Sequence, residues 1–397
     1  MKVRLLTFWI LAVTLAGTAA LLVSTPMEST QTLLARFFAA GPEWAQVHRV
    51  YVDPATQEIS HGESPSRSLG TLANYWVKEP DAGRVLFIGN SQMFQVSLAP
   101  GENAPQEPEK TYPDLVAENF RGASPRHTLC YRLAAPGMSY PEALWYTRFI
   151  MASPQLRPTT IVLQINYQTF WNGGIRDGML DTLDNPRFLA VAKQIAAGGE
   201  PYADDFADAV RRYNARKEQQ KAGAKTTSPE LRLAGPVLAN AFESSVRQAL
   251  AGVPLWQERV RQRGSFYDLL YSARIYLLHI KPTTARSING TRMWRSQSAL
   301  KAVAEACRDN KIRLVLFNAP VNPKVSLYRT ANDLDRYRQF LAGLRSEYQL
   351  PVYDLENSIP APLWGTWMNG PDPLHLGRQG HRLMAATMVR LLDSSLQ

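Results

Sequence analysis

The stretch RVLFIGNSQMFQVS, residues 84–97, combines the features of a buried strand with those of a tight turn. Four apolar residues, 85–88, are followed at once by Gly89 and Asn90, a pattern typical of a central strand of an α/β sheet that ends sharply. Reactive groups in open α/β sheets lie just beyond the carboxyl ends of such strands, where N–H groups opening the next helix can stabilise an anion. The stretch therefore predicts Ser91 as a nucleophile, with an ordinary helix N-cap as the alternative.

A second stretch near the C-terminus, PDPLHLGRQGHRLM at residues 371–384, supplies candidate partners for this serine. Asp372 and His375 lie three residues apart in an expected Pro-containing loop, just before a segment of helical apolar spacing at residues 382–392. A carboxylate at this spacing can bind one ring nitrogen of the histidine and leave the other free to take a proton from a serine hydroxyl. The alternative is structural: the aspartate caps a turn, and the histidine packs against the last helix.

Two further blocks follow strand patterns between these stretches. Gly137 stands in LCYRLAAPGMSYPEALWY, residues 129–146, and Asn166 stands in TTIVLQINYQTFWNGG, residues 159–174. The first block reads as a strand, a turn and an amphipathic helix, and the second begins with an apolar strand pattern. A later block, IRLVLFNAPVNP at residues 312–323, predicts one more strand of the sheet.

In this order the blocks resemble the SGNH (GDSL-like) superfamily of hydrolases and acyltransferases, over roughly residues 81–175 and 300–397. In that superfamily a serine follows the first strand, a glycine and an asparagine from later strand ends help to form the oxyanion hole, and an Asp-x-x-His segment completes the triad. The resemblance implies a catalytic triad of Ser91, His375 and Asp372, and an oxyanion hole formed by Ser91, Gly137 and Asn166.

Three residues depart from the commoner pattern of the superfamily. Asn90 precedes the serine where an aspartate is usual, Gln164 stands where a glycine is usual, and Tyr167 where an aspartate is frequent. The nucleophile itself is retained. The departures therefore concern the cap of the serine turn and the surroundings of Asn166.

The candidate set supplies the roles that ester or thioester exchange requires: a nucleophile, a base, an orienter of the base, and donors aimed at the developing oxyanion. Each preorganised donor is worth about 3 to 4 kcal/mol in the barrier, so a misplaced Asn166 should slow turnover without abolishing it.

His381 is a second histidine that could compete with His375 for the role of base. Because no aspartate lies three positions before it, we expect it to have a structural role at the start of the last helix.

The wider pattern indicates an α/β fold. Strand and helix patterns alternate over residues 84–170 and 297–392, which predicts a mostly parallel sheet flanked by helices on both faces, as in flavodoxin-like three-layer folds. The residues between break the alternation and predict a helical insertion, whose charged part forms a solvated helix, a lid or an acceptor-binding surface. The expected organisation is an anchor at 1–25, a membrane-proximal stem at 26–80, catalytic halves at 81–175 and 297–397, and the insertion at 176–296.

The N-terminus predicts where the chemistry takes place. Lys2 and Arg4 precede 20 uncharged and mostly apolar residues, 5–24. About 20 apolar residues span the hydrocarbon core of a bilayer, and positive charges on the short N-terminal side keep that end in the cytoplasm. We therefore expect a single transmembrane helix in the cytoplasmic membrane and an extracytoplasmic, periplasmic catalytic domain. A cleaved export signal is the alternative.

Composition narrows the set of partners. The chain has 397 residues and 45% hydrophobic content, enough for a substantial core. Without Lys2 and Arg4 it carries 42 basic against 34 acidic residues, a formal charge of +8, which favours an anionic membrane surface or anionic polymer. A solvated basic surface without a specific partner is the alternative. Nucleic acid is not expected as a partner, because no recognition motif accompanies the charge.

The cysteines and histidines indicate no cofactor or metal. Cys130 and Cys307 fall in a predicted strand and a predicted helix, so we expect buried apolar residues rather than a disulfide. No Cys or His cluster has metal-ligand spacing. The aromatic residues near the candidate site, Tyr167, Phe170 and Trp171, could stack on sugar rings, although core packing is the commoner role of such residues.

Within the superfamily, the N-terminal anchor, the serine block and the long insertion are most similar to DltD-like proteins of lipoteichoic acid D-alanylation and to proteins of alginate and cellulose acetylation. The resemblance implies transfer of an acyl group to a cell-envelope polysaccharide or other polymer, with a multi-spanning membrane-bound O-acyltransferase as the partner that supplies it. Two alternatives stay open: an extracytoplasmic esterase or thioesterase that uses water as the acceptor, and a non-catalytic scaffold that holds polymer or partner.

Overall fold

The computed structural model describes residues 82–97, 110–122, 128–135, 137–225, 287–325, 330–367 and 370–396. All of them belong to the second of the two units into which the chain divides, residues 50–397. The expected anchor and stem, residues 1–80, lie outside the described residues. Among the described helices, none has the length and apolar character needed to cross a bilayer.

A parallel sheet of five strands forms the centre of the described structure. The order is β2-β1-β3-β4-β5, with β1 at Gly83–Gly89, β2 at Thr128–Ala134, β3 at Thr160–Ile165, β4 at Arg313–Asn318 and β5 at Val352–Asp354. This is the flavodoxin-like doubly wound order, so the predicted parallel α/β fold is confirmed. The strand order reverses between β1 and β3, and in such folds the ligand crevice opens at the carboxyl ends of these two strands.

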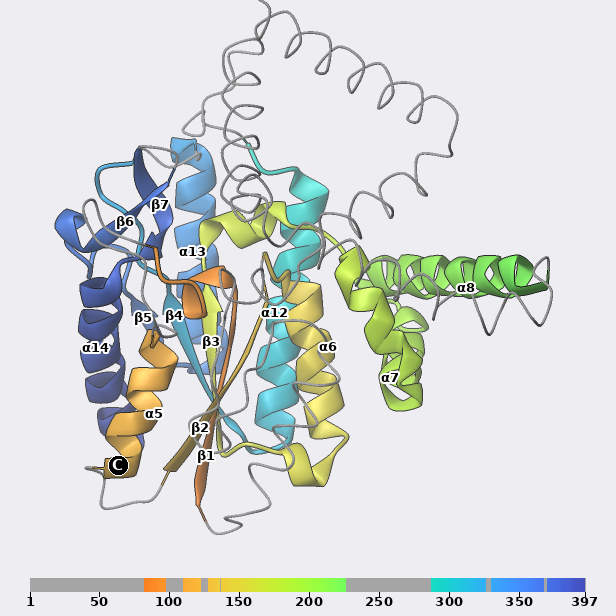
Figure 1. Cartoon of the computed structure of the whole chain (residues 1–397), viewed down its shortest axis with the longest axis horizontal. Helices are drawn as coiled ribbons and strands as arrows, with labels where there is room; N and C mark the ends of the chain where they lie inside the picture. Colours follow the sequence, from red (N-terminus) through yellow and green to blue (C-terminus); the bar gives the residue numbers. More distant parts are fainter. Residues whose placement is uncertain are drawn as a thin grey trace, which may run out of the picture. The chain divides into compact units, whose positions relative to one another are not determined.

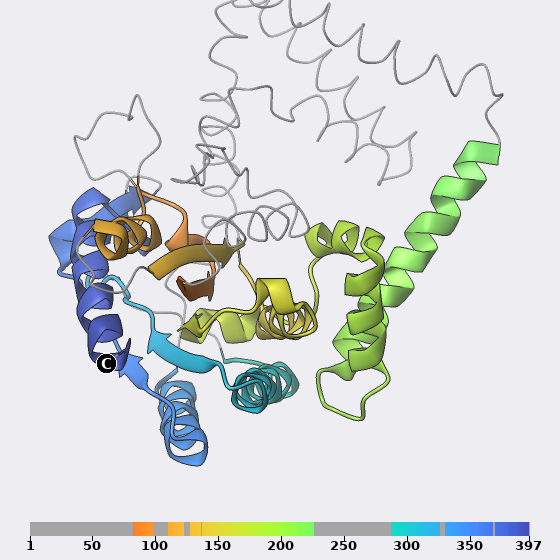
Figure 2. The ribbon, with the colours of Figure 1, turned by 90° about the horizontal axis from the view of Figure 1, so that it is seen from below.

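Helices cover both faces of the sheet (Figure 1). One face packs against α6 (Tyr140–Met151), α12 (Gly290–Asp309) and α13 (Ala331–Tyr348). The other packs against α5 (Tyr112–Gly122) and α14 (Arg378–Leu396), as the view along the sheet shows (Figure 2). Because both faces are covered, the strands are mostly apolar instead of alternating between apolar and polar residues, with Arg132 in β2 and Gln164 in β3 among the exceptions.

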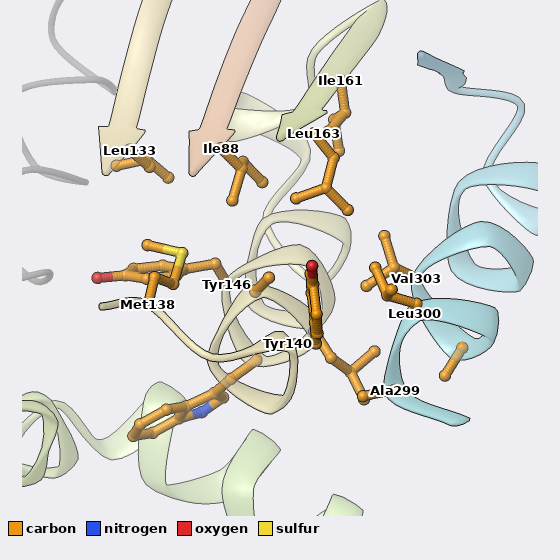
Figure 3. Packing of buried hydrophobic residues seen from close by; sticks show 14 of the residues in the cluster. Ile88, Leu133, Met138, Tyr140, Tyr146, Ile161, Leu163, Ala299, Leu300 and Val303 are labelled. Atoms are coloured by element: carbon orange, nitrogen blue, oxygen red, sulfur yellow. The ribbon is translucent and has the colours of Figure 1, made fainter. Parts of the chain in front are cut away.

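Strand β1 illustrates this burial on both faces. Leu86 and Ile88 point into the cluster shared with α6 and α12, whereas Val85 and Phe87 point into the cluster shared with α5 and α14. All four side chains are fully buried. Figure 3 shows Ile88 and its neighbours facing Tyr140 of α6. The turn that carries Ser91 therefore starts from a strand that is packed on both faces.

The described part of the predicted insertion is helical. It comprises η4 (Asp177–Asp184), α7 (Pro186–Ala196) and α8 (Ala203–Lys225). α12 begins at Gly290, before the expected end of the insertion at residue 296, and packs along α6 in the layer that covers the sheet. Residues 226–286 of the predicted insertion lie outside the described residues.

Asp372 and His375 lie in a strand, so the prediction of a loop was wrong. β7 (Gly370–Leu376) pairs antiparallel with β6 (Trp364–Trp367) in a two-stranded sheet. Trp364 lies opposite Leu376 and Thr366 opposite Pro371, so residues 372–375 bulge out against a single partner residue. The prolines of this segment suggested a loop, but a bulge or an edge strand accommodates proline because its N–H is not needed there.

Candidate active site

The turn after β1 presents Ser91 at the carboxyl edge of the sheet. Ser91 is the first residue of a short 3-10 helix, η1 (Ser91–Met93). Asn90 caps it, because its side-chain oxygen accepts a hydrogen bond from Gln92 N at 3.1 Å. An asparagine in place of the usual aspartate therefore retains the capping contact. A Cβ on Gly89 would lie 2.5 Å from Gln164 Oε1, so a larger residue before the cap would displace the Gln164 side chain.

His375 contacts both of its predicted partners. Its Nε2 lies 2.9 Å from Ser91 Oγ, and its Nδ1 lies 3.0 Å from Asp372 Oδ2. Serine and histidine are 284 positions apart in the chain. With the proton on Nδ1 held by the carboxylate, Nε2 is the nitrogen that accepts the serine proton. The structure thus places the three side chains in the order that nucleophilic catalysis by serine requires.

Asp372 is itself held in place by the bulge of β7. Its Oδ1 accepts the N–H groups of Leu374 and His375, each at 2.9 Å, while Oδ2 faces the imidazole. Asn322 Nδ2 donates to the carbonyl of Asp372 at 2.9 Å. Burial by itself raises the pKa of Asp372, but the hydrogen bonds and charge of His375 and the backbone N–H groups outweigh burial, and the pKa lies below its usual value. The carboxyl group is therefore ionised at neutral pH.

The three predicted oxyanion donors follow three neighbouring strands, β2, β1 and β3. Asn166 caps η3 (Tyr167–Trp171): its Oδ1 accepts from the N–H and the hydroxyl of Thr169, both at 2.8 Å. This leaves Nδ2 as a donor. Gly137 adopts a φ of +60° after β2, and its carbonyl accepts from Asn172 Nδ2 at 3.1 Å. This left-handed conformation favours glycine.

These donors have no protein acceptor within the described structure. Of the described residues, none accepts a hydrogen bond from Ser91 N, Gly137 N or Asn166 Nδ2. Three donors without acceptors at the carboxyl edge are what an oxyanion site needs before substrate arrives.

His381 has a structural role. It is fully buried, its Nδ1 accepts from Tyr112 N at 3.1 Å, and its Nε2 lies 3.2 Å from the carbonyl of Gln95. Burial, the largest cause, lowers the pKa of His381 to about 3, so the ring is neutral. It ties α14 to α5 and to the segment that follows Ser91.

Of the three aromatic residues near the candidate site, Tyr167 and Phe170 belong to the core, as do the two cysteines, whereas Trp171 is only partly buried and packs against the core. Tyr167 and Phe170 are buried and pack edge-on against Tyr337, so they stabilise the turn after β3 and are not exposed to a sugar. Cys130 and Cys307 are buried free thiols. Burial raises the pKa of Cys307 to about 12. Among the described residues, no cluster of His, Cys, Asp or Glu could hold a metal ion.

The charged helix α8 pairs its charges with neighbouring elements. Arg295 of α12 contacts Asp204 and Asp205, and Arg212 contacts Asp177 and Asp208. Beside these ion pairs lies a polar cavity of about 510 Å³, which also reaches the loop at residues 173–175. In the first part of α8, Asp204, Asp205, Asp208 and Arg212 are thus held in ion pairs.

Sequence reasoning missed a pair of buried amides, Gln92 and Gln164, which are 3% and 4% exposed. In the sequence, Gln164 stands out only as a residue at a position where a glycine is usual. The signal that could have revealed the pair is the glutamine in a mostly apolar predicted strand. A buried polar side chain at such a position needs a hydrogen-bond partner. Each lies within two residues of a candidate site residue.

No family model matches the sequence, and no curated protein matches it. Solved structures do show similarity. An acetylxylan esterase from Geobacillus stearothermophilus has 11% identity, with 78% of this chain and 94% of that chain covered and a TM-score of 0.36. A lipase from a goat rumen metagenome has 11% identity, coverage of 77% and 96%, and a TM-score of 0.36.

A GDSL-like lipase from Bacteroides thetaiotaomicron has 11% identity, with 82% of this chain and 99% of that chain covered and a TM-score of 0.31. At these identities and TM-scores, the similarity decides neither the family nor the activity of this chain. The geometry of the site is the observation on which a function rests.

Proposed function

We propose that this protein is an SGNH-type serine enzyme that forms an acyl ester on Ser91. The observation that carries the proposal is the hydrogen-bonded series Asp372, His375 and Ser91, with distances of 3.0 and 2.9 Å. It lies at the sheet edge where doubly wound folds place their ligands. The candidate oxyanion donors of Ser91, Gly137 and Asn166 follow β1, β2 and β3 and support the proposal, because acyl transfer needs donors for the developing oxyanion.

In the first half-reaction, Ser91 Oγ attacks the carbonyl carbon of the acyl donor while His375 Nε2 takes the hydroxyl proton. The negative charge on the former carbonyl oxygen is met by Ser91 N, Gly137 N and Asn166 Nδ2. Ionised Asp372 stabilises the imidazolium that forms. The bond to the leaving group then breaks, and His375 returns its proton to that group, which leaves the acyl ester on Ser91.

In the second half-reaction, an acceptor hydroxyl loses its proton to His375 Nε2 and attacks the ester carbon. The same donors bind the oxyanion. The bond to Ser91 Oγ breaks, and the proton moves from His375 to that oxygen. Water as the acceptor gives an esterase or thioesterase, and a polymer hydroxyl gives an acyltransferase, with no change in these residues.

We favour an acyltransferase that is anchored in the cytoplasmic membrane and modifies an anionic or neutral cell-envelope polysaccharide on the periplasmic side. The basic and apolar N-terminal pattern and the formal +8 of the remaining chain support this assignment. Because acyl-coenzyme A is confined to the cytoplasm, the donor side requires a membrane-bound O-acyltransferase as partner. An esterase with the same triad is the second candidate.

A fluorophosphonate probe tests the nucleophile. We expect covalent labelling of the full-length protein in detergent, and no labelling of S91A. The matched control is S346A, because Ser346 lies on α13 and its hydroxyl bonds only its own helix, to the Gly343 carbonyl. A folded parent protein that resists the probe would favour the non-catalytic scaffold. Labelling of S91A at the parental rate would overturn the assignment of the nucleophile.

Acceptor choice is tested with an activated ester, with and without added polysaccharide. Acyl groups on the polymer indicate transfer, whereas free acid in equal amounts under both conditions indicates hydrolysis. S91A serves as the control for non-enzymatic acylation in each arm.

A further inference from the structure

Two buried glutamine side chains connect the candidate nucleophile to the candidate base. Gln92 directly follows Ser91, and Gln164 lies two residues before Asn166 at the end of β3. Both are almost fully buried. An amide in such a place is costly unless each of its donors and acceptors is satisfied.

Gln164 links β3 to the serine turn from both sides of Ser91. Its Oε1 accepts from the N–H of Asn90 at 3.0 Å, and its Nε2 donates to Gln92 Oε1 at 2.7 Å. The residues before and after the nucleophile are therefore bound to one side chain of the neighbouring strand. A glycine at position 164 would leave both groups without these partners.

Gln92 continues the connection to the base. Its Nε2 donates to the carbonyl of Leu374 at 2.7 Å and to that of Pro320, after β4, at 2.9 Å. Leu374 directly precedes His375. One side chain thus ties the residue after the nucleophile to the residue before the base, which are 282 positions apart.

We infer that Gln92 and Gln164 are positioning residues that hold Ser91 and His375 at hydrogen-bonding distance, an inference that rests on the proposed function. Only an amide side chain offers the acceptor and the two donors that Gln92 uses here. Among the described residues, one side-chain hydrogen bond, between Ser91 Oγ of η1 and His375 Nε2 of β7, joins the nucleophile to the base. A misplacement of about 1 Å in such a pair can cost about 10²-fold in rate.

The test replaces Gln92 by methionine, which has a similar volume but cannot donate or accept these hydrogen bonds. We expect Q92M to lower kcat for p-nitrophenyl acetate at least tenfold and to slow fluorophosphonate labelling in parallel. KM should stay within twofold, because the variant removes none of the candidate oxyanion donors and no group proposed to bind the acyl group. Q92E keeps the acceptor but loses both donors, so we expect it to be as slow as Q92M.

A matched control separates positioning from general destabilisation. Asn318 is a buried amide at the end of β4 whose side chain bonds Tyr337, Asp354 and Glu356 and, among the described residues, makes no hydrogen bond to Ser91 or His375. We expect N318L to lower Tm while kcat stays within twofold of the parent. A loss of kcat in N318L equal to that in Q92M would assign the effect to stability and overturn the inference.

The partner residue gives a second, independent variant. Q164M removes the acceptor for Asn90 N and the donor to Gln92 but leaves both donors of Gln92 in place. We expect a smaller loss of kcat than in Q92M, and a loss in the double variant that is smaller than the product of the two single losses, because the two side chains share one hydrogen bond. If Q92M does not fold, a parental rate in folded Q164M overturns the inference.

The two proposals fail in distinguishable ways. A folded parent protein that neither labels nor turns over ester contradicts the proposed function. A parent that labels, with a folded Q92M that labels equally fast, contradicts only the positioning role.

Discussion

At the scale of the residue, the orientation of His375 depends on a single carboxylate. Asp372 uses one oxygen for the ring and the other for two backbone N–H groups, so the same side chain shapes the bulge and selects the tautomer. An amide at this position keeps an acceptor for the backbone but can present its NH₂ group to the imidazole. The tautomer with the proton on Nε2 would then be favoured, and Nε2 could not accept the serine proton.

We therefore expect D372N to fold and to lower kcat for an activated ester by about 10⁴-fold, the scale seen for the equivalent change in a serine protease triad. Circular dichroism and Tm establish that the variant is folded, and initial rates give kcat. A loss of less than tenfold would show that Asp372 does not control the base.

His381 is a second residue whose protonation matters, this time for stability. Its pKa lies near 3 in the folded state because of burial, against about 6.5 in an unfolded chain. Between these values the unfolded state binds more protons, so the free energy of unfolding falls as the pH is lowered from about 6.5 towards 3. The contribution is about 1.4 kcal/mol per pH unit within that window.

We expect urea unfolding of the parent protein to show a loss of about 2 kcal/mol from this group between pH 6.5 and pH 5. H381Q should be less stable at pH 7, since it loses ring packing against Tyr112, but its stability should depend less on pH. Equal slopes in the two proteins would exclude His381 as the source.

At the scale of the element, the turns after the strands decide where the donors point. The turn after β2 depends on the positive φ of Gly137, and a Cβ there would also meet Asn172 Nδ2 at 3.4 Å. The turn after β1 depends on the Asn90 cap, and the turn after β3 on the Asn166 cap. Each candidate donor is thus set by the local geometry of one short connection.

We expect G137A to cost about 1 to 2 kcal/mol of stability, the usual penalty for a left-handed non-glycine residue. Its kcat should fall by about 10²-fold or more, because a displaced Gly137 N–H is a lost oxyanion donor. The control is G343A on α13, where a Cβ meets nothing within 4 Å and alanine favours the helix. Unchanged kcat in G137A would remove Gly137 from the oxyanion hole.

At the scale of the whole molecule, the proposal joins a periplasmic catalytic domain to an N-terminal anchor. The full-length protein should then appear at full mass in washed membranes and resist extraction by salt. Alkaline carbonate should also leave it in the membrane, since an apolar stretch of about 20 residues binds through the bilayer core. A shortened, soluble protein in the periplasm would indicate a cleaved signal instead.

Much of the fold could be predicted from the sequence because strand and helix signals are local. The apolar runs of β1, β3 and β4 and the amphipathic pattern of the last helix identified a parallel α/β sheet, which the structure confirms. The segment around Asp372 was misjudged, since its strand forms only by pairing with β6. A proline-rich sequence carries no local sign of such a partner.

Part of the candidate site could also be predicted from local sequence signals. Asp372 and His375 could be paired from the sequence, because a spacing of three residues restricts what the two side chains can reach. Ser91 could be singled out because an apolar strand ends in glycine just before it. Their catalytic role stays a prediction.

The sequence by itself determined the strand and helix segments of the α/β fold, the turn that carries the serine, and the pairing of the histidine with its aspartate, because each depends on contacts within a few residues. Only the tertiary structure decided that Ser91 meets His375, that His381 is enclosed, and that Gln92 bonds Gln164 and the backbone before the base. These contacts join segments up to 286 positions apart. The sequence of each segment alone does not specify its distant partner, because the two meet only when the sheet brings the strand ends together.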